Sequence, residues 1–283
     1  MQAPHKYKPF ILLLVLLFCS NAMAFETSEF GEIENCKDFL AQVSEKYDDL
    51  STGVLVRAFD ETYDSCKSNK DYIVIFSSQL SLNHEVDRAK QIIKTFKIEN
   101  PNNKNDKEIL FAEINSEYMA IVALDGESFV GNLSRSTENK LKQIEMEFMD
   151  FVMSYPEWFL PHANLSSLNL LLGNYGTSIR YAETANGLEP SYSAYRNIIV
   201  ASFQLKRDRD VIDTMDFMFS LYPETLEDKD IVLATSKAYV NLNELVLARN
   251  TLIYFLQKKP EFEQDAEIHK AIEYIKIAYE KSK

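Results

Sequence analysis

Residues able to perform acid–base, nucleophilic or metal chemistry are scattered in this sequence. Beyond residue 24 the histidines are His84, His162 and His269, and no two have the four-residue spacing of the zinc motif HExxH. The nucleophile motif GxSxG and the phosphate-binding motifs GxGxxG and GxxxxGK[ST] do not occur. The sequence therefore predicts no catalytic residue, no cofactor and no metal site.

Pairs of acidic residues are the one pattern in the sequence that is compatible with an enzyme. Glycoside hydrolysis needs two carboxylates about 5–10 Å apart, which spacing in the sequence alone does not establish. With 43 acidic residues in the chain, such pairs also arise on solvated helix faces. An enzyme acting on an envelope polymer, peptidoglycan or glycan, remains the alternative hypothesis. The pairs are Glu145 with Glu147, Asp208 with Asp210, and Asp213 with Asp216.

Two cysteines beyond residue 24, Cys36 and Cys66, lie on two segments with helical apolar spacing, 34–47 and 53–66. A break near Leu50 makes these helices antiparallel, and the two arms from Leu50 are about 21 and 24 Å long at 1.5 Å per residue. Both cysteines therefore return to nearly the same level, within the range that a disulfide bridges. The sequence predicts a Cys36–Cys66 disulfide, with two separate buried thiols as the alternative.

The N-terminus has the features of a cleaved export signal. Lys6 and Lys8 precede an apolar run at 10–19, and Ala22 and Ala24 form a small-x-small cleavage pattern. The run is too short for a transmembrane helix, which needs about 20 apolar residues. We expect cleavage after Ala24, no integral membrane span, and a periplasmic or secreted protein, in which disulfides persist.

Composition narrows the fold and the partners. Acidic residues outnumber basic ones 43 to 30, for a net charge of −13, so nucleic acid is not an expected partner. Only 7 glycines occur, which disfavours turn-rich β folds. The sequence therefore predicts a globular all-α protein.

Prolines divide the chain at nearly regular intervals. Pro101, Pro156, Pro190, Pro223 and Pro260 each follow an apolar-periodic stretch, and the last three intervals are 34, 33 and 37 residues. Proline does not continue a helix. A recurring period near 34 indicates a repeat of helical hairpins.

The clearest unit is LLLGNYGTSIRYAETANGLEP, in which Gly173 and Asn174 break one helix and Ala182 and Ala185 follow at helical spacing before Pro190. It resembles the second half of a tetratricopeptide repeat. The same register fits four units, over 71–101 and 159–260. In the third of these, 206–208 is expected to form the turn.

The resemblance is degenerate. No unit has the tryptophan-leucine-glycine-tyrosine signature of that family, and Ser178 and Ile212 replace its usual alanine in the second helix. An ordinary helical bundle whose loops carry prolines is the alternative.

The tetratricopeptide resemblance implies a right-handed superhelix of antiparallel helical hairpins, closed by an amphipathic capping helix at 263–283. It further implies a binding groove lined by the first helix of each hairpin, and a protein or peptide partner that the sequence does not identify. The function expected is an exported interaction scaffold or adaptor of the bacterial envelope. The groove residues expected from the register are Leu160, Ala163, Ser167, Leu170, Asn197, Ala201, Gln204, Leu233, Lys237, Val240 and Asn241.

The expected organisation follows from these features. The 55-residue interval before Pro156 leaves room for an extended loop, 124–136, between two helices. The expected segments are a signal peptide at 1–24, a stapled hairpin at 25–70, repeats with the long loop at 71–157, further repeats at 158–262, and the cap at 263–283.

Overall fold

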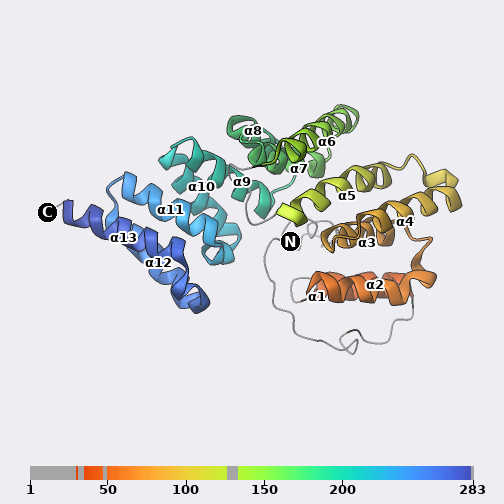
Figure 1. The fold of residues 1–283 in the computed structure, drawn as a ribbon, viewed down its shortest axis with the longest axis horizontal. Coiled ribbons are helices and arrows are strands. Elements are labelled where there is room, and N and C mark those ends of the chain that lie inside the picture. Colours follow the sequence, from red (N-terminus) through yellow and green to blue (C-terminus); the bar gives the residue numbers. More distant parts are fainter. Residues whose placement is uncertain (1–29, 31–34, 47–49, 126–132, 282–283) are drawn as a thin grey trace, which may run out of the picture. The chain divides into compact units, whose positions relative to one another are not determined.

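The computed structural model describes residue 30 and residues 35–46, 50–125 and 133–281, and these ranges contain helices and turns without a strand (Figure 1). This confirms the predicted all-α class. The expected signal peptide at 1–24 lies outside these ranges, as does 126–132 within the expected loop. The α-helices are α1 Cys36–Lys46, α2 Thr52–Cys66, α3 Lys70–Leu82, α4 Val86–Glu99, α5 Lys107–Asp125, α6 Arg135–Ser154, α7 Phe159–Leu171, α8 Tyr175–Leu188, α9 Tyr192–Gln204, α10 Asp208–Leu221, α11 Lys229–Asn241, α12 Leu245–Lys258 and α13 Ala266–Lys281.

Four hairpins share one set of dimensions. In α3–α4, α7–α8, α9–α10 and α11–α12 the first helix has 13 residues and the second has 14. We call the first of each pair helix A and the second helix B. A proline follows two residues after each helix B, at Pro101, Pro190, Pro223 and Pro260. The period in the sequence is therefore a period in the structure.

The turn between helix A and helix B has the same geometry in all four hairpins. One residue in each turn adopts a left-handed backbone conformation: His84, Gly173, Lys206 or Asn243, with φ of 64°, 75°, 59° and 62°. The next amide then donates to a carbonyl five residues earlier, as from Glu244 to Tyr239 at 2.8 Å. This hydrogen bond satisfies a carbonyl at the end of helix A and fixes the angle of the hairpin.

These left-handed residues align the four repeats residue by residue. Five positions after each lies a fully buried residue of helix B: Ala89, Ser178, Val211 or Ala248. In α10 the sequence had predicted Ile212 at this position, so the expected register is one residue late there. Lys206, rather than glycine, forms that turn, which spans 205–207 instead of the expected 206–208.

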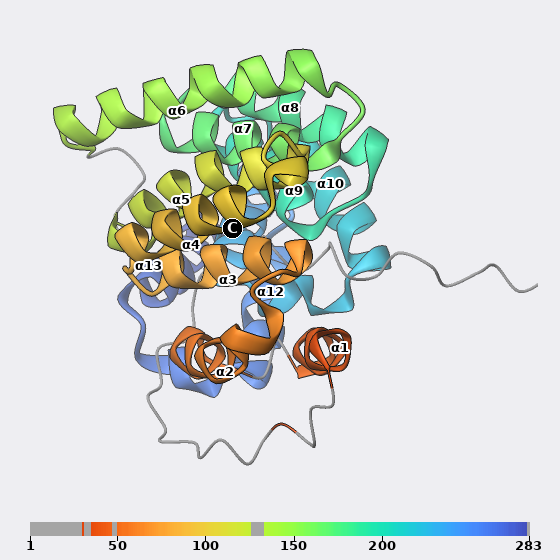
Figure 2. The ribbon, with the colours of Figure 1, turned by 90° about the vertical axis from the view of Figure 1, so that its right-hand side faces the viewer.

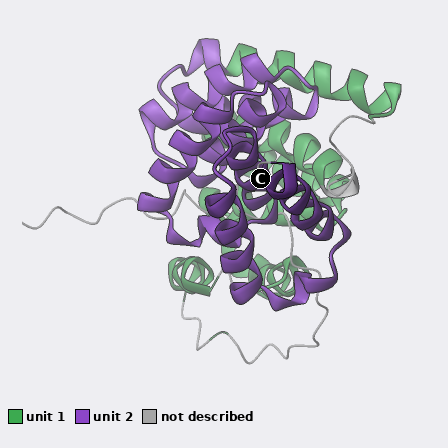
Figure 3. Cartoon of the chain, turned by 90° about the vertical axis from the view of Figure 1, so that its left-hand side faces the viewer, with its two compact units in different colours: residues 1–151 green, residues 152–283 purple. Residues whose placement is uncertain are grey.

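The chain forms two compact units, Met1–Phe151 and Val152–Lys283 (Figure 3). In unit 1, α1 and α2 pack together and α2 packs on α3, as Figure 2 shows with α1 and α2 nearly end-on. Cys36 and Cys66 form the predicted disulfide, with Cα atoms 5.2 Å apart. This pair joins the N-terminal end of α1 to the C-terminal end of α2.

An aromatic cluster fills the core beside this disulfide. The ring centre of Phe59 lies 5.0 Å from that of Phe39, 4.9 Å from Tyr72 and 5.2 Å from Phe76. All four side chains are buried. Helices α1, α2 and α3 are therefore held by one shared set of rings.

Unit 2 contains α7 to α13, and each helix A contacts the next helix A along the chain: α7 with α9, α9 with α11, and α11 with α13. Helix α13 occupies the place of a further helix A. It buries Ile268, Ala271 and Ile275 against the preceding hairpin. The positions that match Val232, Ser236 and Tyr239, which are buried in α11, are polar and exposed in α13: His269, Glu273 and Lys276. This exchange is what a capping helix requires.

A repeated set of ion pairs ties successive repeats together. In each set a cation in one helix A pairs with two carboxylates at the start of the second helix after it (α5, α11 or α13), in the pattern Asp-x-Asp or Asp-x-Glu. The first aspartate also accepts hydrogen bonds from backbone amides of the first turn, which caps the helix. The sets are Lys70 with Asp106 and Glu108, Arg196 with Asp228 and Asp230, and Lys229 with Asp265 and Glu267.

These ion pairs predict how acid destabilises unit 2. Burial alone would raise the pKa of Asp265, but hydrogen bonds from the amides of Ile268 and Glu267 and from Lys229 lower it below its usual value. A lowered pKa in the folded state stabilises the protein above about pH 3.9, and this contribution is lost as pH falls through the folded-state value. Asp265→Asn is therefore expected to lower the free energy of unfolding by about 0.5–1 kcal/mol at neutral pH, and the difference from wild type is expected to shrink as pH falls below about 3.9.

Urea unfolding followed by the fluorescence of Trp158, the single tryptophan, measures this effect in unit 2. Glu263→Gln removes an equal charge from an exposed side chain nearby and is the matched control. An Asp265→Asn difference that persists unchanged at pH 3 would contradict the role given to its charge.

Candidate binding surface

The described residues bring no three histidine, cysteine, aspartate or glutamate side chains together in a way that would hold a metal ion. His84 is exposed in its turn, and His269 is exposed on α13. His162 is only 5% exposed, and its Nε2 lies 2.9 Å from the carbonyl oxygen of Pro156. Each histidine thus has a separate structural setting.

None of the acidic side chains in the three pairs is buried: Glu145 and Glu147 are half-buried within α6, and the other two pairs lie on α10. Asp213 and Asp216 are both exposed on α10, where partial burial and the charge of Asp213 raise the pKa of Asp216. Asp208 begins α10 and accepts a hydrogen bond from Asn241 Nδ2 at 3.0 Å. Each pair belongs to a single helix, α6 for Glu145 and Glu147 and α10 for the other two pairs.

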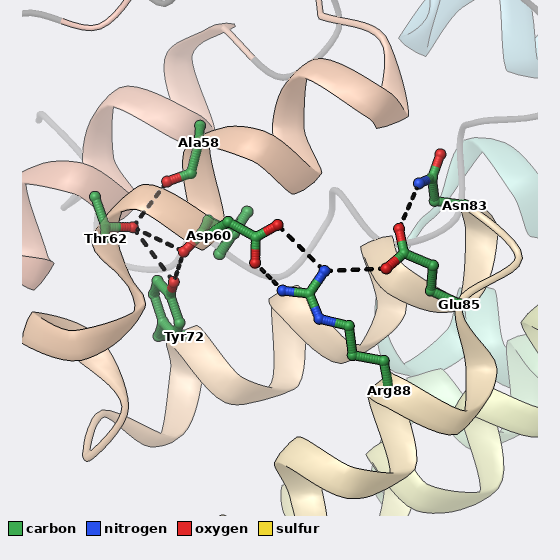
Figure 4. Close-up of polar contacts among 8 residues, drawn as sticks. Ala58, Asp60, Thr62, Tyr72, Asn83, Glu85 and Arg88 are labelled. Atoms are coloured by element: carbon green, nitrogen blue, oxygen red, sulfur yellow. Dashed lines mark hydrogen bonds and ion pairs between the residues drawn. The ribbon is translucent and has the colours of Figure 1, made fainter.

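A polar cluster in unit 1 centres on Arg88, at the start of α4 (Figure 4). Its guanidinium pairs with Asp60 of α2 and with Glu85 Oε2, the latter at 3.0 Å. Asn83 Nδ2 donates to Glu85 at 2.8 Å, and the guanidinium lies 5.4 Å from the centre of the Phe76 ring. These contacts connect α2 to α4, so the cluster joins two helices and its charged groups are already paired.

Beside Arg88 the surface has an open depression of about 380 Å³, lined by residues 84–88. Deeper in the same unit, Tyr72 Oη donates to the carbonyl of Phe59 and lies 3.3 Å from Thr62 Oγ1. Burial is the main reason that the pKa of Tyr72 is raised well above its usual value. This hydroxyl therefore stays protonated and serves packing.

A more extensive surface follows from the repeat itself. Positions 5, 9, 12 and 13 of each helix A have the spacing i, i+4, i+7 and i+8, which places them on one stripe of the helix. In unit 2 most of these side chains are half-buried or exposed. We call them the helix-A face. Its residues are Ser167, Leu170, Leu171, Arg196, Val200, Phe203, Gln204, Leu233, Lys237 and Asn241.

The eleven groove residues expected from the sequence divide into two groups. Six are accessible and belong to the helix-A face: Ser167, Leu170, Gln204, Leu233, Lys237 and Asn241. The other five are buried and do not present their side chains to a partner. They are Leu160 (2% exposed), Ala163 (1%), Asn197 (4%), Ala201 (0%) and Val240 (8%).

Asn197 and Ala201 are expected in the groove from a register that is one residue late in this hairpin, and the structure buries both side chains. They match Ala234 and Ala238 of α11, which pack inside the unit, whereas Arg196 and Val200 match Leu233 and Lys237. The sequence reading thus missed Arg196, Val200 and Phe203, which the left-handed turn at Lys206 would have located. Asn197 Nδ2 instead donates to Ser167 Oγ at 2.9 Å and Ser166 Oγ at 3.1 Å, which joins α9 to α7.

Polar contacts link the helices along the helix-A face. Lys237 Nζ lies 5.6 Å from the centre of the Phe203 ring, between α11 and α9. Asn241 donates to Asp208 and accepts from Tyr274 Oη of α13 at 3.4 Å. These contacts connect α11 to α9, α10 and α13.

A second exposed apolar surface lies on α12. Val246 is 67% exposed and Ile253 is 42% exposed, and their spacing of seven residues places both on the same face of the helix. The matching residues of α10 are Arg209 and Asp216. The stripe formed by Val246 and Ile253 therefore does not recur in α10, whereas the helix-A face recurs in three repeats.

No protein-family model matches this chain, and no curated protein matches its sequence. Within the described ranges, no helix combines the length and the apolar content needed to cross a membrane.

Proposed function

We propose that this protein is an exported interaction scaffold that binds a partner protein or peptide along the helix-A face of unit 2. The hairpins would form a right-handed superhelix similar to that of tetratricopeptide repeats, with the helix-A face on its concave side. The site of action would be the bacterial envelope, either the periplasm or the outside of the cell.

The observation that carries this proposal is the recurrence of one accessible stripe in three successive repeats. Position 12 holds Leu170 in α7 and Phe203 in α9, and both remain partly exposed although they are apolar. Apolar side chains left accessible at equivalent places in neighbouring helices are typical of a surface that another chain covers. The Cys36–Cys66 disulfide supports the proposed compartment, because disulfides persist in oxidising environments.

Site-specific photo-crosslinking in cells tests this proposal. A photoreactive residue at Gln204, on the helix-A face, is expected to form a covalent adduct with a defined protein, and the same residue at Asn250, on the exposed surface of α12, is not. Adducts formed only from Asn250 would move binding to α12 and overturn the proposal. Adducts that resist protease and are digested by glycan-cleaving enzymes would favour an envelope polymer as the ligand.

A further inference from the structure

Charge is distributed unevenly between the helix-A face and the rest of the protein. Acidic residues outnumber basic ones over the whole chain, yet α7 has no charged residue and α9 has only Arg196. Beyond its first two residues, α11 has only Lys237. The three helices that form the face therefore offer almost no repulsion to an anionic ligand.

The cationic side chains near this face differ in whether they already pair with carboxylates of this protein. Arg196 pairs with Asp228 and Asp230, and Lys229 pairs with Asp265 and Glu267. Among the described residues Lys237 makes no ion pair, and its ammonium group lies over the Phe203 ring. The carboxylate at the adjoining start of α10, Asp208, accepts from Asn241. Lys237 is thus the ammonium on this face with capacity for a further anion.

The surroundings of Lys237 define the anion that suits it. An ammonium group has three donors, and a ring on one side leaves the others available to a carboxylate. Val200 occupies in α9 the position that Lys237 occupies in α11, and Leu233 lies one turn before Lys237. A ligand that contacts Lys237, Val200 and Leu233 together needs a carboxylate next to apolar groups.

We propose that the helix-A face binds a peptide segment in which an aspartate or glutamate lies next to apolar residues, with the acidic side chain received by Lys237. This inference rests on the proposed function and adds the chemistry of the ligand to it. A side-chain carboxylate is the better fit than a chain terminus, because Arg196 and Lys229 are already paired and a single ammonium remains. The apolar neighbours supply binding area, and the charge pair supplies selectivity.

Selection from a library of short random peptides with amidated C-termini, using the whole mature protein, tests this inference. Selected peptides are expected to be enriched in acidic residues flanked by apolar ones. Replacing the acidic residue of a selected peptide by its amide is expected to weaken binding about tenfold. Lys237→Glu is expected to lose the acidic peptides and to select basic ones instead.

Lys258→Glu is the matched control. Lys258 lies 5.9 Å from the centre of the Tyr254 ring on α12, away from the helix-A face, so its replacement changes net charge and a cation–π contact in the same way. It is expected to leave peptide binding unchanged, and the melting temperatures of both variants show that they are folded.

The outcomes separate this inference from the proposed function. One outcome is that selected peptides bind the wild-type protein and not the Val200→Glu variant, yet show no preference for acidic residues. That result would overturn the inference and leave the proposed function standing. Binding that requires a free peptide C-terminus instead of an acidic side chain would overturn it too. Failure to select any peptide, together with no adduct at Gln204, would overturn both.

Discussion

Removal of the Cys36–Cys66 disulfide is expected to lower the free energy of unfolding of unit 1 by about 3–4 kcal/mol, because the cross-link closes 30 residues and restricts the unfolded chain. The loss is large for this part of the protein because α1 and α2 are the first of the described helices and pack against α3 on one side. We expect the melting transition of unit 1 to fall by about 10 °C or more.

The measurement compares wild type with the Cys36→Ser, Cys66→Ser double variant and with reduced wild type. Hydrogen exchange of the α1 and α2 amides is expected to become faster. The unfolding temperature of unit 2, followed by the fluorescence of Trp158, is expected to stay unchanged. For a denatured, unreduced chain that begins at Phe25, two reactive thiols per chain would contradict the bridge.

Phe59→Ala is expected to cost about 3–5 kcal/mol, because it leaves a cavity at the centre of the aromatic cluster. The Phe59 ring is fully buried and packs against one ring from α1 and two rings from α3. Its backbone carbonyl also accepts from Tyr72 Oη, and movement of α2 into the cavity would disturb that hydrogen bond.

Ile98→Ala provides the control in the same unit. Ile98 is 70% exposed on α4, so its truncation is expected to change the free energy of unfolding by no more than about 0.5 kcal/mol. Urea unfolding followed by far-ultraviolet circular dichroism resolves the two variants. A Phe59→Ala loss similar to that of Ile98→Ala would show that the cluster does not hold the three helices together.

The sequence by itself determined the helices, their pairing into hairpins and the disulfide. Proline punctuation marked the hairpin ends because proline does not continue a helix. Apolar residues three and four apart marked the helices because the period of the helix is fixed by its backbone. The Cys36–Cys66 bridge followed from two helix lengths and one turn, which are local quantities.

Tertiary structure decided the register of the hairpin α9–α10. The left-handed residue of a turn is visible in the sequence where it is glycine, as at Gly173, but not where the turn is imposed on Lys206. A shift of one residue rotates a helix by about 100°, which exchanges packed positions with accessible ones. Asn197 and Ala201 are therefore buried, and Arg196 and Val200 take their places on the helix-A face.

The same distinction holds for charge. The sequence shows that Arg196, Lys229 and Lys237 lie in helices A, but carboxylates 30 or more residues away decide which of them are neutralised. Those contacts depend on how one repeat stacks on the next. Only the packed structure distinguishes the paired Arg196 and Lys229 from Lys237, because spacing within a helix does not determine what lies across it.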